Sequence, residues 1–165
     1  MFIVAMVISF LLDGIISGFI QVNSIFLPLF SLLSLVLVYP YFKNKNKNFL
    51  IAAAIMGCMY DVVYTNSLFL NGMLFVLLAI VIDKLFSYLP INILNTYMVS
   101  AFVITVYRAL IFLFLVLIQV VSFDMVRLSH SIASSVLANL FYVTIVYVIL
   151  SILAKRYNIK KESKI

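Results

Sequence analysis

The sequence predicts an all-α, polytopic membrane protein that crosses the bilayer six times. Of its 165 residues, 67% are hydrophobic and only 10% are charged, whereas a soluble domain carries roughly 25% charged residues. The hydrophobic residues form runs close to the length of about 20 residues that a helix needs to cross a membrane. Short polar or basic segments separate these runs. A water-soluble fold could not bury this much apolar surface, so a soluble domain is excluded.

Six apolar runs are the candidate spans, and together they form one transmembrane domain over residues 1–154, followed by a basic tail over residues 155–165. Pro28 and Pro40 interrupt the second run, and the third run is short. A polar segment over residues 122–131 separates the fifth run from the sixth. The predicted spans cover residues 2–20, 25–42, 49–64, 68–82, 97–121 and 132–153.

The positions of the basic residues predict how the spans are oriented. Cytoplasmic loops of membrane proteins carry an excess of Lys and Arg. If the loop with Lys43, Lys45 and Lys47 is cytoplasmic, Lys84 and the basic tail are cytoplasmic too, and only Arg127 falls outside. We therefore expect both termini to lie in the cytoplasm. The formal charge of +6 is then explained by membrane topology and does not indicate a nucleic-acid-binding surface. The basic residues of the tail are Lys155, Arg156, Lys160, Lys161 and Lys164.

Three ionisable residues fall deep inside the predicted spans: Asp13, Asp61 and Arg108. Each lies about 11 or 12 residues from the cytoplasmic end of its span, which is roughly 16–18 Å at 1.5 Å per residue. This is one level near the middle of a hydrocarbon core about 30 Å thick. We expect Arg108 to pair with Asp61, Asp13 or both, either to stabilise the bundle or to form a proton relay or ligand contact.

The segment between the third and fourth spans concentrates the polar residues. Gly57 lies one helical turn before Asp61 on the same face and should permit close approach of the next helix. Tyr60 and Tyr64 are expected to anchor the hairpin at the outer membrane interface. A short polar turn over residues 65–67 then leads into the fourth span. The residues singled out in this hairpin are Gly57, Tyr60, Asp61, Tyr64, Asn71 and Gly72.

No catalytic, metal or cofactor site is expected. His130 is flanked by Ser129 and Ser131, but the G-x-S-x-G motif of serine hydrolases is absent from the sequence. The single histidine and the single cysteine, Cys58, lie on different segments, which argues against a zinc site. A phosphate-binding glycine loop is also absent. We therefore expect a protein that is not an enzyme.

The run over residues 54–68, AIMGCMYDVVYTNSL, resembles the rod shape-determining protein MreD family. That family typically shows a glycine, an aspartate four residues later near a helix end, a polar turn, a Leu-Gly pair and a new apolar helix. Gly57 and Asp61 match this pattern, whereas the expected Leu-Gly pair reads Leu68-Phe69 and the glycine is displaced to Gly72. The length, the six spans and the basic tail fit the family over nearly the whole chain.

The resemblance implies a non-enzymatic scaffold in the bacterial cytoplasmic membrane that maintains rod shape. MreD proteins associate with MreC and help to connect MreB filaments to the wall-synthesis enzymes RodA and a class B penicillin-binding protein. The family fold looks like the six-helix substrate-binding component of energy-coupling-factor vitamin transporters. Besides these proteins, the expected partner is membrane lipid, with no nucleic acid and no cofactor.

Two other functions are compatible with the residues. A vitamin-binding transport component would need polar ligand groups near the outer helix ends and small residues for docking, such as Ala5 and Ser9 in the first span. A channel or proton-coupled carrier could instead be built on Asp13, Asp61 and Arg108, because intramembrane charges are functional candidates. A bound vitamin or transporter ATPase would favour the first alternative, and a single-span coiled-coil partner would favour the scaffold.

Overall fold

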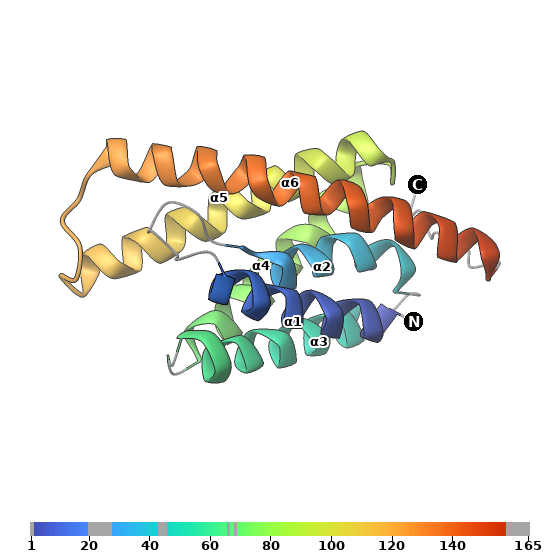
Figure 1. Cartoon of the computed structure of the whole chain (residues 1–165), viewed down its shortest axis with the longest axis horizontal. Helices are drawn as coiled ribbons and strands as arrows, with labels where there is room; N and C mark the ends of the chain where they lie inside the picture. Colours follow the sequence, from blue (N-terminus) through green and yellow to red (C-terminus); the bar gives the residue numbers. More distant parts are fainter. Residues whose placement is uncertain (1, 20–27, 43–45, 66, 68, 158–165) are drawn as a thin grey trace.

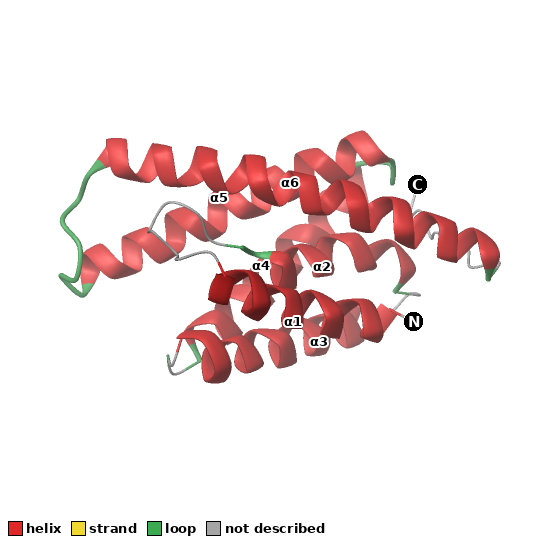
Figure 2. Cartoon of the chain, viewed as in Figure 1, coloured by secondary structure: helices red, strands yellow, loops and turns green. Residues whose placement is uncertain are grey.

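The computed structural model describes residues 2–19, 28–42, 46–65, 67 and 69–157, and all its regular elements are helices (Figures 1 and 2). A 3₁₀ turn, η1, extends the second helix, and a π-helical turn, η2, extends the third. The predicted all-α class is therefore confirmed. The elements are α1 (Phe2–Phe19), α2 (Phe30–Val38), η1 (Tyr39–Tyr41), α3 (Asn46–Tyr60), η2 (Asp61–Thr65), α4 (Leu70–Tyr88), α5 (Ile93–Leu117) and α6 (Met125–Arg156).

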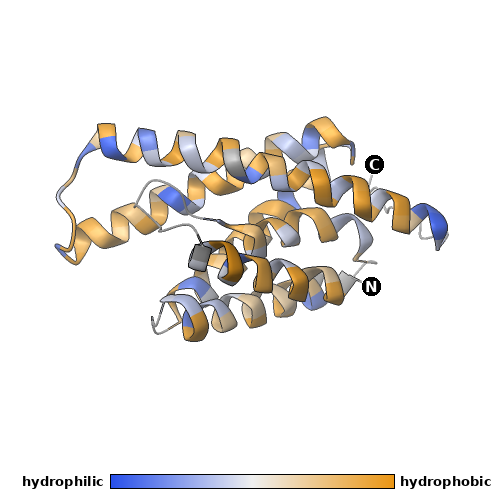
Figure 3. Cartoon of the chain, in the orientation of Figure 1, coloured by the Kyte–Doolittle hydropathy of each residue, from blue (hydrophilic) through white to orange (hydrophobic). Residues whose placement is uncertain are grey.

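Four helical segments in the described part of the chain are long and apolar enough to cross a membrane. Hydrophobic residues predominate along the helices (Figure 3), and many of their side chains are exposed; for example, Val62 and Leu117 are each 79% exposed. Such a surface is compatible with lipid and not with water, so the protein is an integral membrane protein. The four segments are Lys47–Thr65, Leu70–Tyr88, Ile93–Leu117 and Met125–Arg156, and the shorter apolar helices are Ile3–Gly18 and Phe30–Tyr41.

Helix α2 forms the core of the bundle. All nine of its residues are buried, and it contacts α1, α4, α5 and α6. In Figure 1 it lies between α1 and α6. A helix that is apolar on every side is stable only when other helices enclose it. Its polar ends must then find hydrogen-bond partners inside the protein, because neither lipid nor water can supply them.

Three helices extend beyond the predicted spans. In each of them a polar residue that was expected to lie in a loop caps the helix or is hydrogen-bonded to another helical segment. Helix α4 continues past Asp83, whose carboxylate accepts a 2.6 Å hydrogen bond from the Tyr39 hydroxyl. Helix α5 starts four residues earlier than predicted, since the Asn92 side chain caps it by accepting from the Asn95 N–H. Helix α6 starts at Met125 and not at residue 132, because Asp124 caps it. The polar residues Asn92 and Asp124, which the sequence suggested were in loops, are thus the N-caps of α5 and α6.

Candidate functional site

The best-defined polar site lies where α3 turns into α4, and the carboxylate of Asp61 is its centre. Asp61 is 2% exposed and accepts hydrogen bonds from the backbone N–H groups of Asn71 (3.0 Å) and Gly72 (2.9 Å). The Asn71 amide (2.8 Å) and the hydroxyls of Thr65 and Ser67 also donate to it. The first N–H groups of a helix have no partner within that helix, and the helix dipole there favours a negative charge. Asp61 therefore caps α4 from the preceding helix.

Gly57 allows α3 and α4 to approach closely one turn before Asp61. A Cβ atom on Gly57 would lie 2.5 Å from the Asn71 carbonyl oxygen and 2.8 Å from the Gly72 Cα. A Cβ atom on Gly72 would in turn lie 3.0 Å from the Cys58 Sγ. A side chain at Gly57 would therefore push the two backbones apart, whereas one at Gly72 would first displace the Cys58 side chain. Their contact brings the start of α4 within reach of the Asp61 carboxylate.

Phe69 occupies the N-cap position of α4 with a left-handed backbone, at φ 59°. A residue with a Cβ pays roughly 1–2 kcal/mol for this conformation, whereas glycine adopts it freely. This is the position at which the MreD-like pattern has the glycine of its Leu-Gly pair. The structure thus gives a physical reason for a glycine there, and this chain places a 65%-exposed phenylalanine at the same point.

We expect Phe69→Gly to raise the stability of the protein by about 0.5–1 kcal/mol, because it relieves the left-handed strain. Thermal unfolding in detergent, followed by circular dichroism, measures the change. Met73→Gly is the matched control: Met73 is also exposed, at 75%, but lies inside α4, where glycine costs about 1 kcal/mol. A lower melting temperature for Phe69→Gly would mean that the phenyl ring contributes more than the strain costs.

Asn71 connects this hairpin to α5. Its side-chain oxygen accepts a 2.7 Å hydrogen bond from the hydroxyl of Tyr107, which is 2% exposed. Its amide nitrogen also donates to the Thr65 hydroxyl at 3.1 Å. Asp61, Asn71 and Tyr107 consequently form one buried chain of hydrogen bonds across three helices. The role of Tyr107 could not be predicted, since nothing in the sequence links it to the hairpin.

Tyr60 and Tyr64 pack against other helices of the bundle, and their role as anchors at the membrane interface stays a prediction. Tyr60 is 5% exposed, and its ring lies 5.0 Å from the ring of Tyr64 and 5.7 Å from that of Phe75. The Tyr64 hydroxyl donates a 2.6 Å hydrogen bond to the backbone carbonyl of Phe10 on α1. Its ring covers Gly14, where a Cβ atom would lie 2.7 Å from the hydroxyl oxygen. Tyr64 therefore joins α1 to the hairpin, and Tyr60 packs against the ring of Tyr64.

Asp13, on α1, also caps the N-terminus of another helix, as Asp61 does in the hairpin. Its carboxylate accepts hydrogen bonds from the N–H groups of Phe30 (2.8 Å) and Ser31 (2.7 Å), and from the Ser31 hydroxyl. Asn139 on α6 accepts a 2.9 Å hydrogen bond from the Leu29 N–H at the same helix start. The buried N-terminus of α2 is thereby capped by side chains of two other helices, α1 and α6.

Arg108 donates hydrogen bonds to α6. Its Nε donates to the buried Ser135 hydroxyl at 2.9 Å, and Nη2 donates to the same oxygen. The hydrogen bonds that Asp13 and Asp61 accept come from helix N–H groups, an amide and hydroxyls. Helix N-termini, hydroxyls and an amide thus satisfy these two carboxylates, and the ion pair with Arg108 stays a prediction.

The remaining predicted residues lie at the surface or outside the described part of the chain. Lys47, near the start of α3, and Lys155 and Arg156, in the last turn of α6, are exposed. Lys43 and Lys45 fall outside the described residues. Within the described residues, no group of three or more His, Cys, Asp or Glu side chains could hold a metal ion.

The fold and the hairpin define a polytopic, all-helical membrane protein in which buried carboxylates cap helices within the bundle. The family model of the rod shape-determining protein MreD matches residues 1–157. The chain belongs to this family, as the hairpin motif predicted, and its role lies in rod shape determination. Searches of curated proteins and of solved structures give no match.

Proposed function

We propose that the chain is a non-enzymatic scaffold of the bacterial cell-elongation machinery that binds MreC. Through MreC it helps to couple MreB filaments to peptidoglycan synthesis by RodA and a class B penicillin-binding protein. The observation that carries this proposal is the family match over residues 1–157. MreC would be held by packing between membrane helices, for which the bundle offers a groove on its outer surface.

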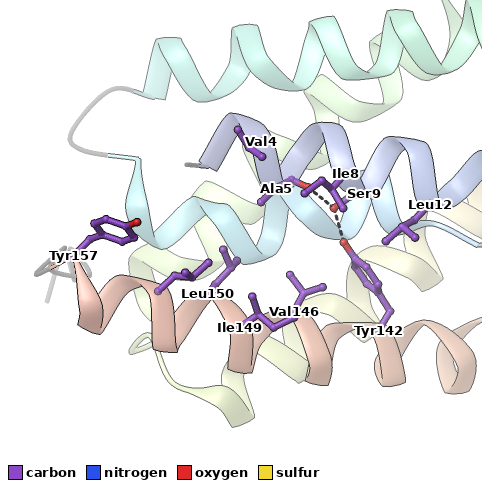
Figure 4. Close-up of a pocket in the computed structure, with 11 residues that line it drawn as sticks. Val4, Ala5, Ile8, Ser9, Leu12, Tyr142, Val146, Ile149, Leu150 and Tyr157 are labelled. Atoms are coloured by element: carbon purple, nitrogen blue, oxygen red, sulfur yellow. Dashed lines mark hydrogen bonds between the residues drawn. The ribbon is translucent and has the colours of Figure 1, made fainter.

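An apolar groove of about 770 Å³ runs between α1 and α6 (Figure 4). The hydroxyls of Ser9 and Tyr142 share a hydrogen bond that joins the two helices. This polar pair is therefore satisfied within the protein, and the other lining side chains are apolar apart from the Tyr157 hydroxyl. The lining residues are Val4, Ala5, Ile8, Ser9, Leu12, Tyr142, Val146, Ile149, Leu150, Leu153 and Tyr157.

The shape of this groove supports a transmembrane helix as its occupant. The lining positions recur every three or four residues on both helices, which is the spacing of the ridges and grooves in helix packing. Ala5 and Ser9 place two small residues one turn apart, as in close helix contacts within membranes. From Tyr142 to Tyr157 the groove follows α6 for about 22 Å, most of a hydrocarbon core about 30 Å thick. A single-span partner such as MreC fits these dimensions.

We also propose six spans with both termini on the cytoplasmic side of the cytoplasmic membrane. Support comes from Figure 1, in which the first turn of α1 and the last turn of α6 lie toward the same side of the bundle. The exposed Lys155 and Arg156 then mark the cytoplasmic side. Helix α1, with 18 residues, is about 27 Å long and nearly spans the hydrocarbon core. The likeness to the six-helix substrate-binding components of vitamin transporters belongs to the same proposal.

Site-specific photo-crosslinking in the native host tests the docking of MreC. A photoreactive side chain at Ile149, in the α1–α6 groove, is expected to capture MreC. The same side chain at Leu77, in an apolar groove between α3 and α4, is expected to capture none. Filling the groove with Ala5→Leu should reduce the crosslink about tenfold, since a loss of about 1.4 kcal/mol is one decade in affinity.

Ala133→Leu is the matched control, because Ala133 is exposed on α6 and does not line the groove; it should leave the crosslink unchanged. Capture of MreC from Leu77 alone would move the docking site to α3 and α4. Recovery of a transporter ATPase or a vitamin with the tagged chain, in place of MreC, would contradict the scaffold itself.

A further inference from the structure

A second, smaller cavity lies between α5 and the first turns of α6 and has a different chemical character. Its volume is about 140 Å³, and its lining includes Arg108 from α5 and Arg127 and Ser131 from α6. The other lining residues are apolar, such as Phe112 and Leu115. No carboxylate is among the described residues that line it. The cavity thus combines two guanidinium groups and a hydroxyl with apolar walls.

These groups match the chemistry of a phosphate group. A guanidinium presents its N–H groups in a planar fork that fits phosphate oxygens, and apolar surroundings strengthen such charge-assisted hydrogen bonds. A single water needs about 10–15 Å³, so this cavity of about 140 Å³ has room for a group of several heavy atoms. The neighbouring Asp124 directs its Oδ1 at the N–H groups of Val126 and Arg127, where it caps α6.

The depth of the cavity suits the headgroup of a lipid. Helix α6 has 32 residues and is about 48 Å long, which exceeds the hydrocarbon core of about 30 Å. Arg127, in its first turn, therefore lies near the level of the lipid headgroups. Arg108 lies about 14 Å below the end of α5, and its guanidinium lines the same cavity. That guanidinium also donates to Ser135, one turn further along α6 than Ser131, so it lies at the inner end of the cavity.

We propose that this cavity binds a phosphate group, supplied by the headgroup of an anionic phospholipid or by free phosphate. Arg127 and Arg108 hold the phosphate oxygens, and Ser131 donates a further hydrogen bond. With a lipid, the acyl chains lie along the apolar outer faces of α5 and α6, where Leu113 and Leu137 are exposed. The proposal rests on this cavity alone and is independent of the docking of MreC.

Native mass spectrometry of the full-length chain in detergent tests the proposal. The probes are dioleoylphosphatidylglycerol and dioleoylglycerol, which has the same acyl chains and no phosphate. We expect the phosphatidylglycerol to bind at least tenfold more tightly than the dioleoylglycerol. Arg127→Gln should lower the affinity for the phosphatidylglycerol about tenfold. Since Arg127 is exposed, this substitution does not threaten the core of the bundle.

Arg156→Gln is the matched control, because it removes the same charge from the other end of α6, where the residue is also exposed; it should change affinity less than twofold. Equal losses in the two variants would show a diffuse effect of surface charge and overturn the site. Equal binding of the two lipids would overturn it as well. Displacement of the lipid by inorganic phosphate would support the site with free phosphate as a ligand, and failure of phosphate to compete would assign it to the lipid headgroup.

Discussion

Asp61→Ala is expected to destabilise the protein by about 3 kcal/mol or more and to abolish its function in cell shape. The substitution removes the acceptor of five hydrogen bonds and leaves the N–H groups of Asn71 and Gly72 buried without partners. Each buried group left unsatisfied costs about 1–3 kcal/mol. Circular dichroism melting in detergent measures the stability, and complementation of a strain that lacks its own MreD measures the function.

Asp124→Ala is the control for this prediction, because it also removes a carboxylate that caps a helix. Asp124 is exposed and caps α6 through its own neighbours, Val126 and Arg127. Water can replace the lost acceptor there, and the expected cost is about 1 kcal/mol. Equal tolerance of the two substitutions, in both stability and complementation, would contradict the structural importance of Asp61.

Gly57→Ala is expected to destabilise the protein by about 1–3 kcal/mol, although alanine favours helices more than glycine does. The new Cβ atom would lie 2.5 Å from the Asn71 carbonyl oxygen and 2.8 Å from the Gly72 Cα. Both are backbone atoms, so the contact is relieved only if α3 and α4 move apart. That movement would also lengthen the hydrogen bonds from the start of α4 to Asp61. The melting temperature should fall, and complementation should weaken with it.

Gly18→Ala gives the opposite expectation from the same chemical change. Gly18 lies near the end of α1, and a Cβ atom there would meet nothing within 4 Å. Alanine should therefore be neutral or stabilise the helix by up to about 1 kcal/mol. If the two variants shift the melting temperature in the same direction, the close contact at Gly57 does not control the hairpin.

Asp13 and Asp61 share a role that explains two carboxylates in an apolar bundle. Each caps the N-terminus of another helix, α2 in the case of Asp13 and α4 in the case of Asp61. A buried helix start presents free N–H groups and a positive dipole end, which together offset part of the cost of burying the carboxylate. Arg108, which the sequence suggests as their partner, contacts Ser135 and lines the cavity between α5 and α6; its pairing with either carboxylate stays a prediction.

The sequence by itself determined the class of the protein and the location of its main motif. Hydropathy is a property of consecutive residues, so apolar runs and basic clusters could be recognised without knowledge of packing. The hairpin was predictable for the same reason: Gly57, Asp61 and Gly72 lie within one short segment, and the contacts among them are local in sequence. The family assignment followed from that segment and is confirmed over residues 1–157.

Only the tertiary structure decided which groups satisfy the buried charges. At the start of α2, the N–H groups donate to Asp13, which is 17 residues away in the sequence, and to Asn139, which is 110 residues away. Such partners are chosen by helix packing, which no local pattern encodes. The sequence suggested an ion pair because the three charges shared one depth in the membrane. The structure gives each carboxylate a helix N-terminus, since unpaired N–H groups enclosed in an apolar bundle need acceptors as much as buried charges need partners.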